Sequence, residues 1–224
     1  PGKCTFAGVG KTREEIEYAL QQGIYSINVE SEEEAFFINQ VASELNLVAP
    51  IAFRVNPNVD AKTHKYISTG KSENKFGIDF EFILDAYERA SSLPHLKLKG
   101  LQMHIGSQLT SVSPFVEAVE KVTPLAADLK NKYDIEFFSI GGGIGIVYEE
   151  ALASGSESWW TKQPDETRPL TPEQYSSAII PSLAPLGLKI LLEPGRFIAG
   201  NAGVLVTKCL YEKKGSTKTF KIVD

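Results

Sequence analysis

The sequence has few residues of the kinds that form disulfides or bind metal ions. Its 224 residues include 2 cysteines and 3 histidines. Cys4 and Cys209 lie too far apart in the chain to indicate a disulfide framework or a zinc site, and no cluster of further cysteines or histidines accompanies them. We therefore expect no metal centre, and a reducing, cytoplasmic environment.

Long apolar runs and clusters of positive charge are also missing. No apolar run approaches the roughly 20 residues that span a bilayer, and the first residues lack the pattern of a signal peptide and an initiating methionine, as in an excerpt of a longer chain. The net charge is -5, and the pI is near 5.4. Because nucleic acids and anionic membranes bind clustered positive charge, we expect neither as a partner, and a small molecule instead.

What the sequence does contain is a regular alternation of short apolar segments with helical patterns. With 42% hydrophobic residues the chain can build a sizeable core, and the alternation is typical of βα units around a parallel sheet. Thr12 and Ser31 are N-cap candidates, because glutamates follow in the first turn. The predicted strands are 4–7, 26–29, 51–55, 100–104, 137–140 and 189–192, and the predicted helices are 12–22, 31–46, 79–92, 114–132 and 172–186.

Glycines and polar side chains follow the predicted strands and do not precede them. Residues 141–145 read Gly-Gly-Gly-Ile-Gly, residues 193–196 read Glu-Pro-Gly-Arg, and residues 104–107 read His-Ile-Gly-Ser. Successive glycines allow backbone N–H groups to approach an anion closely. In a (β/α) barrel the site is built from loops at the carboxyl ends of the strands. The pattern therefore predicts a barrel with a phosphate-binding edge that also carries a carboxylate, a guanidinium and an imidazole.

A closed barrel of this kind needs eight strands, and only six are visible. We therefore predict an incomplete (β/α)8 barrel over residues 1–198. After Ile198 the pattern changes to an apolar run, a turn at Gly215-Ser216 and an alternating segment over 219–223, so residues 199–224 are predicted to begin a second, β-rich domain. The polar stretch 154–168 is predicted to be an insertion or lid.

Taken together, these motifs resemble the diaminopimelate decarboxylases, a family of fold-type III pyridoxal-phosphate enzymes. Their TIM-like barrel is of the alanine racemase and group IV decarboxylase type. The resemblance runs nearly end to end, and Gln108 and Thr110 after His-Ile-Gly-Ser favour this branch over the ornithine and arginine relatives. Besides the segments above, the matching motifs are 8–12, 28–31, 54–57, 66–70, 75–77 and 201–203.

The resemblance implies pyridoxal 5'-phosphate as cofactor and assigns a role to several residues. Glu193 would face the pyridine nitrogen, His104 would stack on the ring, and Arg196 would also grip a substrate carboxylate, for which a planar guanidinium is well suited. Arg54 would bind near the cofactor. The implied cofactor-binding set is Arg54, Ser107, Gly141, Gly142, Gly143, Glu193, Pro194, Gly195 and Arg196.

The resemblance further implies decarboxylation of meso-2,6-diaminopimelate to L-lysine and carbon dioxide, the last step of lysine biosynthesis, by a homodimer. The family's Schiff-base lysine belongs to a Tyr-Ala-x-Lys-Ala-Asn type of motif that does not occur in these residues. We expect that lysine upstream of Pro1 and most of the substrate pocket, including a cysteine lent across the dimer interface, downstream of Asp224. The 224 residues alone are accordingly expected to be inactive.

Other interpretations stay open at this point. The substrate could be ornithine, arginine or carboxynorspermidine, or the chain could be a pyridoxal-phosphate-binding barrel without decarboxylase activity. A dinucleotide site is disfavoured, because Ile146 breaks the pattern G-x-G-x-x-G after the glycines. His104 alone could be an ordinary core histidine. Glu193 and Arg196 could form a surface ion pair, although apolar neighbours at 191–192 and 197–198 indicate partial burial.

Overall fold

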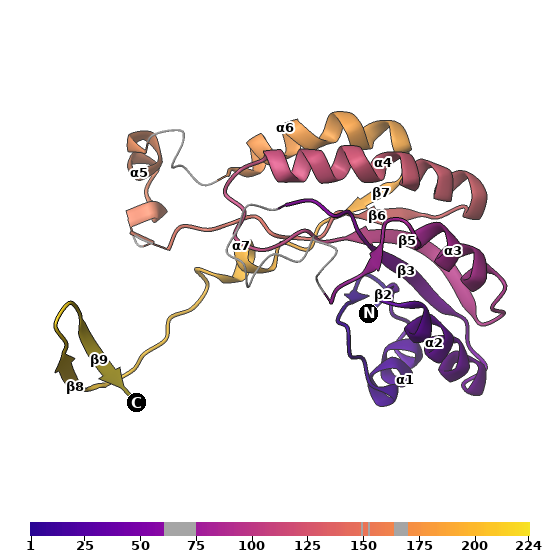
Figure 1. Ribbon diagram of the computed structural model, residues 1–224, viewed down its shortest axis with the longest axis horizontal. Coiled ribbons are helices and arrows are strands. Elements are labelled where there is room, and N and C mark those ends of the chain that lie inside the picture. The colour runs from indigo at the N-terminus through magenta and orange to yellow at the C-terminus, as the bar shows by residue number, and fades with distance from the viewer. Residues whose placement is uncertain (61–74, 149, 152, 164–169) are drawn as a thin grey trace.

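The computed structural model describes residues 1–60, 75–148, 150–151, 153–163 and 170–224 (Figure 1). Its main sheet has seven strands, β1 (Thr5–Phe6), β2 (Ser26–Val29), β3 (Ala49–Asn56), β4 (Ile78–Asp79), β5 (Leu96–Met103), β6 (Phe137–Ser139) and β7 (Lys189–Leu191). The helices are α1 (Arg13–Gln21), α2 (Glu32–Glu44), α3 (Ile83–Ser91), α4 (Ser113–Tyr133), α5 (Glu157–Lys162), α6 (Pro172–Leu183) and α7 (Gly195–Ala199). The motif at 66–70 lies outside the described residues.

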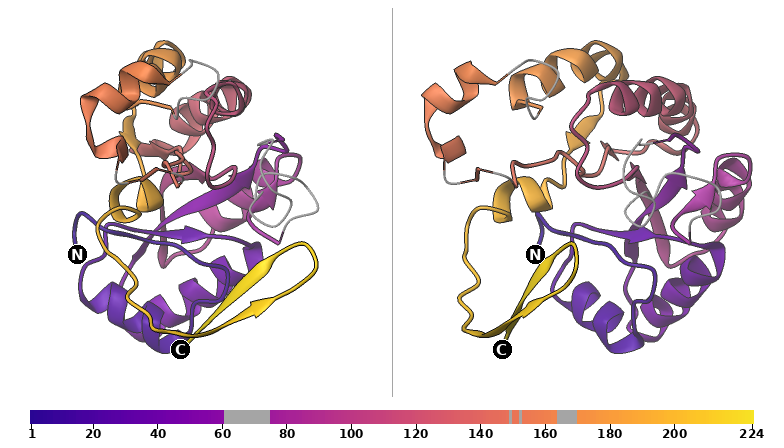
Figure 2. Two further views of the ribbon diagram at one scale, coloured as in Figure 1. Left: turned by 90° about the vertical axis from the view of Figure 1, so that its left-hand side faces the viewer. Right: turned by 60° about the vertical axis from the view of Figure 1, so that its left-hand side comes forward.

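The strands of the main sheet are all parallel and follow one another in chain order. The order is β1-β2-β3-β5-β6-β7, and β4 pairs with the end of β3. All six predicted strands are confirmed within a few residues, whereas β4 was missed because two residues are too short to show a period. Figure 2 shows the sheet curled, with helices α1 to α4 and α6 on its outer face. Every carboxyl end of these strands therefore lies on the same rim.

Helices α1, α2 and α6 each begin at a residue whose side chain caps the helix. The hydroxyl of Thr12 accepts a hydrogen bond from the Glu15 N–H, and the Glu15 carboxylate accepts one from the Thr12 N–H. Ser31 caps α2 through the Glu34 N–H, and Thr171 and Gln174 form a second reciprocal pair at α6. Such caps satisfy N–H groups that have no partner within the helix. The predicted helix starts at residues 12, 31 and 172 are confirmed, while α3 starts later than predicted.

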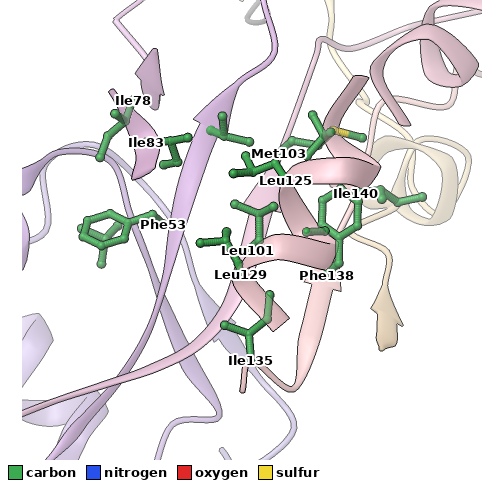
Figure 3. Close-up of a cluster of buried hydrophobic side chains, with 14 of the residues drawn as sticks. Phe53, Ile78, Ile83, Leu101, Met103, Leu125, Leu129, Ile135, Phe138 and Ile140 are labelled. Carbon is green, nitrogen blue, oxygen red and sulfur yellow. The ribbon is translucent and has the colours of Figure 1, made fainter. Parts of the chain in front are cut away.

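The core lies between the sheet and the outer helices. Figure 3 shows Leu101 and Met103 of β5 and Phe138 of β6 packed toward Leu125 and Leu129 of α4. Burial of this apolar surface is the main force that holds helix and sheet together. Because the outward-facing side chains of the strands fill this layer, the inward-facing ones are free to carry polar groups.

The last part of the chain differs from the barrel repeats. After β7 comes the five-residue helix α7, which the sequence did not predict, and then an extended segment in which Val204, Leu205 and Val206 are 87%, 92% and 88% exposed. Strands β8 (Cys209–Lys214) and β9 (Thr219–Val223) form a separate antiparallel hairpin, set apart from the barrel in Figure 1. A domain boundary at residue 198 stays a prediction.

The stretch predicted as an insertion or lid over 154–168 is described only in part. A short 3-10 turn over 153–155 leads into it, and helix α5 follows. In α5, Trp159 and Trp160 pack edge to face with ring centroids 5.2 Å apart. The remainder of the stretch lies outside the described residues, so the lid stays a prediction. Among the described helices, none is both long enough and apolar enough to cross a bilayer.

Candidate active site

The carboxylate of Glu193 lies where four strands end on the rim. Glu193 lies two residues after the end of β7. Its carboxylate oxygens accept hydrogen bonds from the Ser139 hydroxyl at 2.7 Å, the Asn28 amide at 3.3 Å and the Gln102 amide at 3.4 Å. These donors come from β6, β2 and β5, and all three are neutral. The carboxylate is therefore oriented by hydrogen bonds while its negative charge remains available to a cationic partner.

The amide donors beside Glu193 carry a second signal. Asn28 and Gln102 are 0% and 1% exposed, and in the described part of the structure the Asn28 Oδ1 and Gln102 Oε1 atoms have no hydrogen-bond partner. Buried polar atoms are rarely left unpaired unless a bound molecule or ion completes them. Together with the oriented carboxylate, these atoms fit a site that holds a polar ring.

His104 follows β5 and faces the glycine loop that follows β6. Its Nδ1 atom accepts a hydrogen bond from the Gly142 N–H at 3.1 Å. Burial, and secondly the positive charge of Arg54, lower the pKa of His104 to about 4. The imidazole is therefore neutral at pH 7 and carries its proton on Nε2. A neutral, fixed ring suits the predicted stacking role, which stays a prediction.

The glycines at 141–143 are required by close packing. A Cβ on Gly142 would lie 2.1 Å from the Glu193 carbonyl oxygen, and one on Gly143 would lie 2.5 Å from the Gly106 carbonyl oxygen. Gly141 and Gly143 also have φ values of +73° and +114°, which residues with a Cβ rarely adopt. The glycines thus let the loops after β5, β6 and β7 lie against one another.

Two of the three glycine N–H groups have hydrogen-bond partners within the protein. The N–H of Gly141 points to the Ser139 hydroxyl at 3.4 Å, and that of Gly142 points to His104. Both N–H groups thus have partners inside the protein, and the expectation that three consecutive N–H groups face an anion stays a prediction. Among the described residues, Gly143 has no acceptor for its N–H, so it is the donor of this segment that a phosphate could use.

The loops after β6 and β7 are joined by their main chains. The Glu193 N–H donates to the Gly141 carbonyl at 2.8 Å, and the Gly195 N–H donates to the Glu193 carbonyl at 2.8 Å. Pro194 lies between them, and Gly195 begins α7. Ser107 is half-buried in the loop after β5. The sequence-predicted residues 104, 107, 141–143 and 193–195 are thus gathered on one rim.

Two predicted arginines have partners that the sequence did not predict. Arg54 is 8% exposed and pairs with Glu30, with 3.0 Å between guanidinium nitrogen and carboxylate oxygen. Arg196 donates to the Tyr148 hydroxyl at 2.6 Å. In the described part of the structure it makes no ion pair with Glu193. Glu193 and Arg196 are both partly buried, as predicted, although their neighbours Leu192 and Ile198 are 50% and 70% exposed.

An open hollow of about 650 Å³ lies beside the Arg196–Tyr148 pair, and it is lined in part by Tyr148, Trp160, Phe197 and Asn201. Its position next to the arginine offers room for an elongated molecule with a charged end. Within the described residues, no group of three His, Cys, Asp or Glu side chains could hold a metal ion.

Several site residues were given no role from the sequence, although two of them, Asn28 and Glu30, lie in the matching motif 28–31: Asn28, Gln102, Ser139, Glu30 and Tyr148. Asn28, Gln102 and Ser139 each have an apolar residue on both sides in the sequence. A polar residue within a buried strand needs a partner, so this pattern was the signal that could have found them. Tyr148 had no such signal, because its contact depends on how two loops meet.

Comparison with known proteins places this geometry in a wider context. A family model described as "Pyridoxal-dependent decarboxylase, pyridoxal binding domain" matches residues 1–200. The diaminopimelate decarboxylase of Vibrio cholerae is 44% identical over 226 residues, which cover 100% of this chain and 50% of that protein. The one from Campylobacter jejuni is 44% identical over 223 residues and covers 99% and 52%. The chain therefore spans about half the length of the curated relatives it matches.

Solved structures give the same result for the fold. The crystal structure of diaminopimelate decarboxylase from Helicobacter pylori complexed with L-lysine is 40% identical, with a TM-score of 0.85 over 100% of this chain and 52% of that one. A lysine decarboxylase from Selenomonas ruminantium, with 20% identity and a TM-score of 0.72, shares the fold alone. These likenesses confirm the predicted barrel type, present here in part.

Proposed function

The chain belongs to the pyridoxal-binding domain family of the pyridoxal-dependent decarboxylases, and on this premise we propose that it forms part of a diaminopimelate decarboxylase. The reaction removes one carboxyl group of meso-2,6-diaminopimelate to give L-lysine and carbon dioxide. The bond from the α-carbon to the carboxylate breaks, carbon dioxide leaves, and a proton replaces it on that carbon. The observation that carries the proposal is the Glu193 carboxylate, oriented by three neutral donors on the rim.

The residues present fit pyridoxal 5'-phosphate as cofactor. When bound, the cofactor's pyridinium ring withdraws the electron pair left on the α-carbon. Glu193 would keep the ring nitrogen protonated. Its three hydrogen-bond donors are neutral, so its negative charge would favour the positive charge of the protonated ring. The unpaired oxygens of Asn28 and Gln102 lie in the same place and are further acceptors for a bound polar group.

Other residues would hold the ring and its phosphate. His104, neutral and fixed by the Gly142 N–H, would lie against the ring face. The free N–H of Gly143, with Ser107, Gly195 and Arg196, would bind the phosphate. The guanidinium of Arg54 is paired with Glu30, so Arg54 would lie near the cofactor without binding it directly.

The choice of substrate is supported by the names of the relatives. Eight curated relatives at 42% to 44% identity are all named diaminopimelate decarboxylase, and a structure at 40% identity is complexed with L-lysine. Arg196, whose partner Tyr148 lines the hollow, would bind a substrate carboxylate. Nothing specific favours ornithine, arginine or carboxynorspermidine, or a barrel without activity.

We propose that the covalent lysine anchor and most of the substrate pocket come from parts of the protein beyond these 224 residues. We further propose that the whole protein works as a homodimer in the cytoplasm. None of these features is visible in the residues described above.

The proposal is tested with the complete open reading frame that contains this sequence. The purified protein should bind pyridoxal phosphate stoichiometrically and release carbon dioxide from meso-diaminopimelate, with L-lysine as the other product. Parallel assays with ornithine and arginine decide the branch. Release of carbon dioxide from either of these, but not from diaminopimelate, would refute the substrate assignment while leaving the cofactor assignment intact.

A further inference from the structure

Glu30 at the end of β2 is a buried carboxylate with both oxygens in use. It is 7% exposed. Its Oε1 atom accepts a hydrogen bond from the Arg54 guanidinium at 3.0 Å, and its Oε2 atom accepts one from the Gly77 N–H at 2.8 Å. One side chain thus joins β2 to the end of β3 and to the loop that leads into β4.

Arg54 extends this connection toward the candidate site. A second nitrogen of its guanidinium donates to the His104 carbonyl at 3.4 Å, and the group lies 4.8 Å from the centroid of the Phe76 ring. His104 is in turn bonded to Gly142, and the Gly141 carbonyl accepts from the Glu193 N–H at 2.8 Å. A continuous series of bonds therefore crosses the ends of β2, β3, β5, β6 and β7.

The loop at Gly77 is built to fit against Arg54. Gly77 has a φ of +73°, and a Cβ there would lie 2.9 Å from the Arg54 carbonyl oxygen. The Glu30 carboxylate accepts from this glycine and from the arginine side chain at once, so it fixes both relative to β2. Without Glu30, the guanidinium would be a buried charge that no other carboxylate of the described residues pairs with.

We propose that Glu30 is a positioning residue, which through Arg54 holds the main chain of His104 in place on the rim. This proposal rests on the proposed function, since His104 matters there as the residue against the cofactor ring. A buried ion pair alone gives little net stability, because removing two charges from water costs nearly what their attraction returns. The Glu30–Arg54 pair is better explained by its role in fixing the end of β5 to the ends of β2 and β3 than by a contribution to net stability.

The proposal is tested in the full-length holoenzyme with Glu30→Gln, which keeps the shape and removes the charge. We expect kcat to fall roughly ten- to hundredfold with KM little changed, as when a catalytic group is displaced by a fraction of an ångström. The circular dichroism of the bound cofactor should change, because it reports the surroundings of the ring. Glu32→Gln is the matched control, since Glu32 pairs with Arg89 between α2 and α3 in a partly exposed ion pair that does not include Arg54 or His104; it should change neither quantity.

The double variant Glu30→Gln/Arg54→Met separates positioning from simple stability. Two neutral residues should restore resistance to heat, while kcat and the dichroism stay altered because nothing holds the His104 carbonyl. A double variant with wild-type kcat and dichroism would overturn the proposal, as would a Glu30→Gln variant unchanged in both.

A readout that does not need activity makes the result independent of the proposed function. The ¹⁵N chemical shifts of the His104 imidazole, measured without substrate, should move in Glu30→Gln and stay fixed in Glu32→Gln. Unmoved shifts in Glu30→Gln would refute the positioning role. A wild-type protein without decarboxylase activity would refute the proposed function, and the imidazole shifts would then decide on Glu30 alone.

Discussion

Replacing Gly142 by alanine should displace Glu193 and impair both folding and turnover. The new Cβ would lie 2.1 Å from the Glu193 carbonyl oxygen, whereas ordinary contact begins at 3.4 Å, so the loop after β7 must move by about 1.3 Å. The loop cannot swing away freely, because the Glu193 N–H is bonded to Gly141 at 2.8 Å. Overpacking of this kind costs about 1–3 kcal/mol of stability.

The effect on turnover should be at least as large. A displacement of about 1 Å in a catalytic group lowers the rate roughly a hundredfold, which corresponds to about 2.7 kcal/mol of activation free energy. In the full-length protein we therefore expect a lower melting temperature, reduced cofactor occupancy and a strongly reduced kcat in the fully loaded fraction. Thermal unfolding, cofactor absorbance and carbon dioxide release measure the three quantities.

Gly2→Ala is the matched control, because a Cβ at Gly2 would lie 3.9 Å from its nearest neighbour, the Gly23 carbonyl oxygen, and its φ is not positive. The same change in backbone freedom there should leave stability and kcat nearly unchanged. Wild-type melting temperature and kcat in Gly142→Ala would refute the reasoning, because the loop would then have yielded without moving the carboxylate.

Three further predictions concern single residues of the site. Glu193→Gln in the full-length protein should lower kcat more than cofactor affinity, because the carboxylate acts on the transition state; an unchanged kcat would remove Glu193 from this role. Arg196→Lys should lower kcat/KM for diaminopimelate roughly ten- to hundredfold, which corresponds to one lost charge-assisted hydrogen bond of about 1.5–3 kcal/mol. Cofactor content is measured alongside, and a kcat/KM equal to that of the wild type would contradict the role of Arg196. The lowered pKa of His104, about 4 against an ordinary 6.5, means that the unfolded chain binds more protons between these values. Stability should therefore fall as pH falls from 7 to 5, by about 2 kcal/mol in urea unfolding, and His104→Gln should lose that part of the dependence.

The repeating part of the fold was predictable because its signals are local. The apolar strands alternate with helices, and the caps at Thr12, Ser31 and Thr171 depend on residues three positions apart. Strand β4 and helix α7 were not predictable in the same way. They have two and five residues, and their backbones are set by neighbours that lie far away in the chain.

The candidate site was predictable in its motifs but not in its bonds. Glycines and charged residues after strands indicated the correct rim. Glu193 is bound by Asn28, Gln102 and Ser139 because these inward-facing residues lie at similar heights along neighbouring strands. Their heights are set by the register of the strands, which the sequence does not show. The use of the Gly142 N–H by His104 likewise requires knowing how two loops meet.

The chain-order arrangement of the sheet has a consequence for synthesis on the ribosome. From β1 to β3, and from β5 to β7, each strand pairs with the strand made just before it, so the half-barrel can assemble progressively as it emerges. The rim is different, because the bond between Asn28 and Glu193 joins residues 165 positions apart. Until β7 has been added, the amides of β2 and β5 have no carboxylate to bind. Bonding of Glu193 to the rim thus follows the addition of β7, after the other described strands of the main sheet have been made.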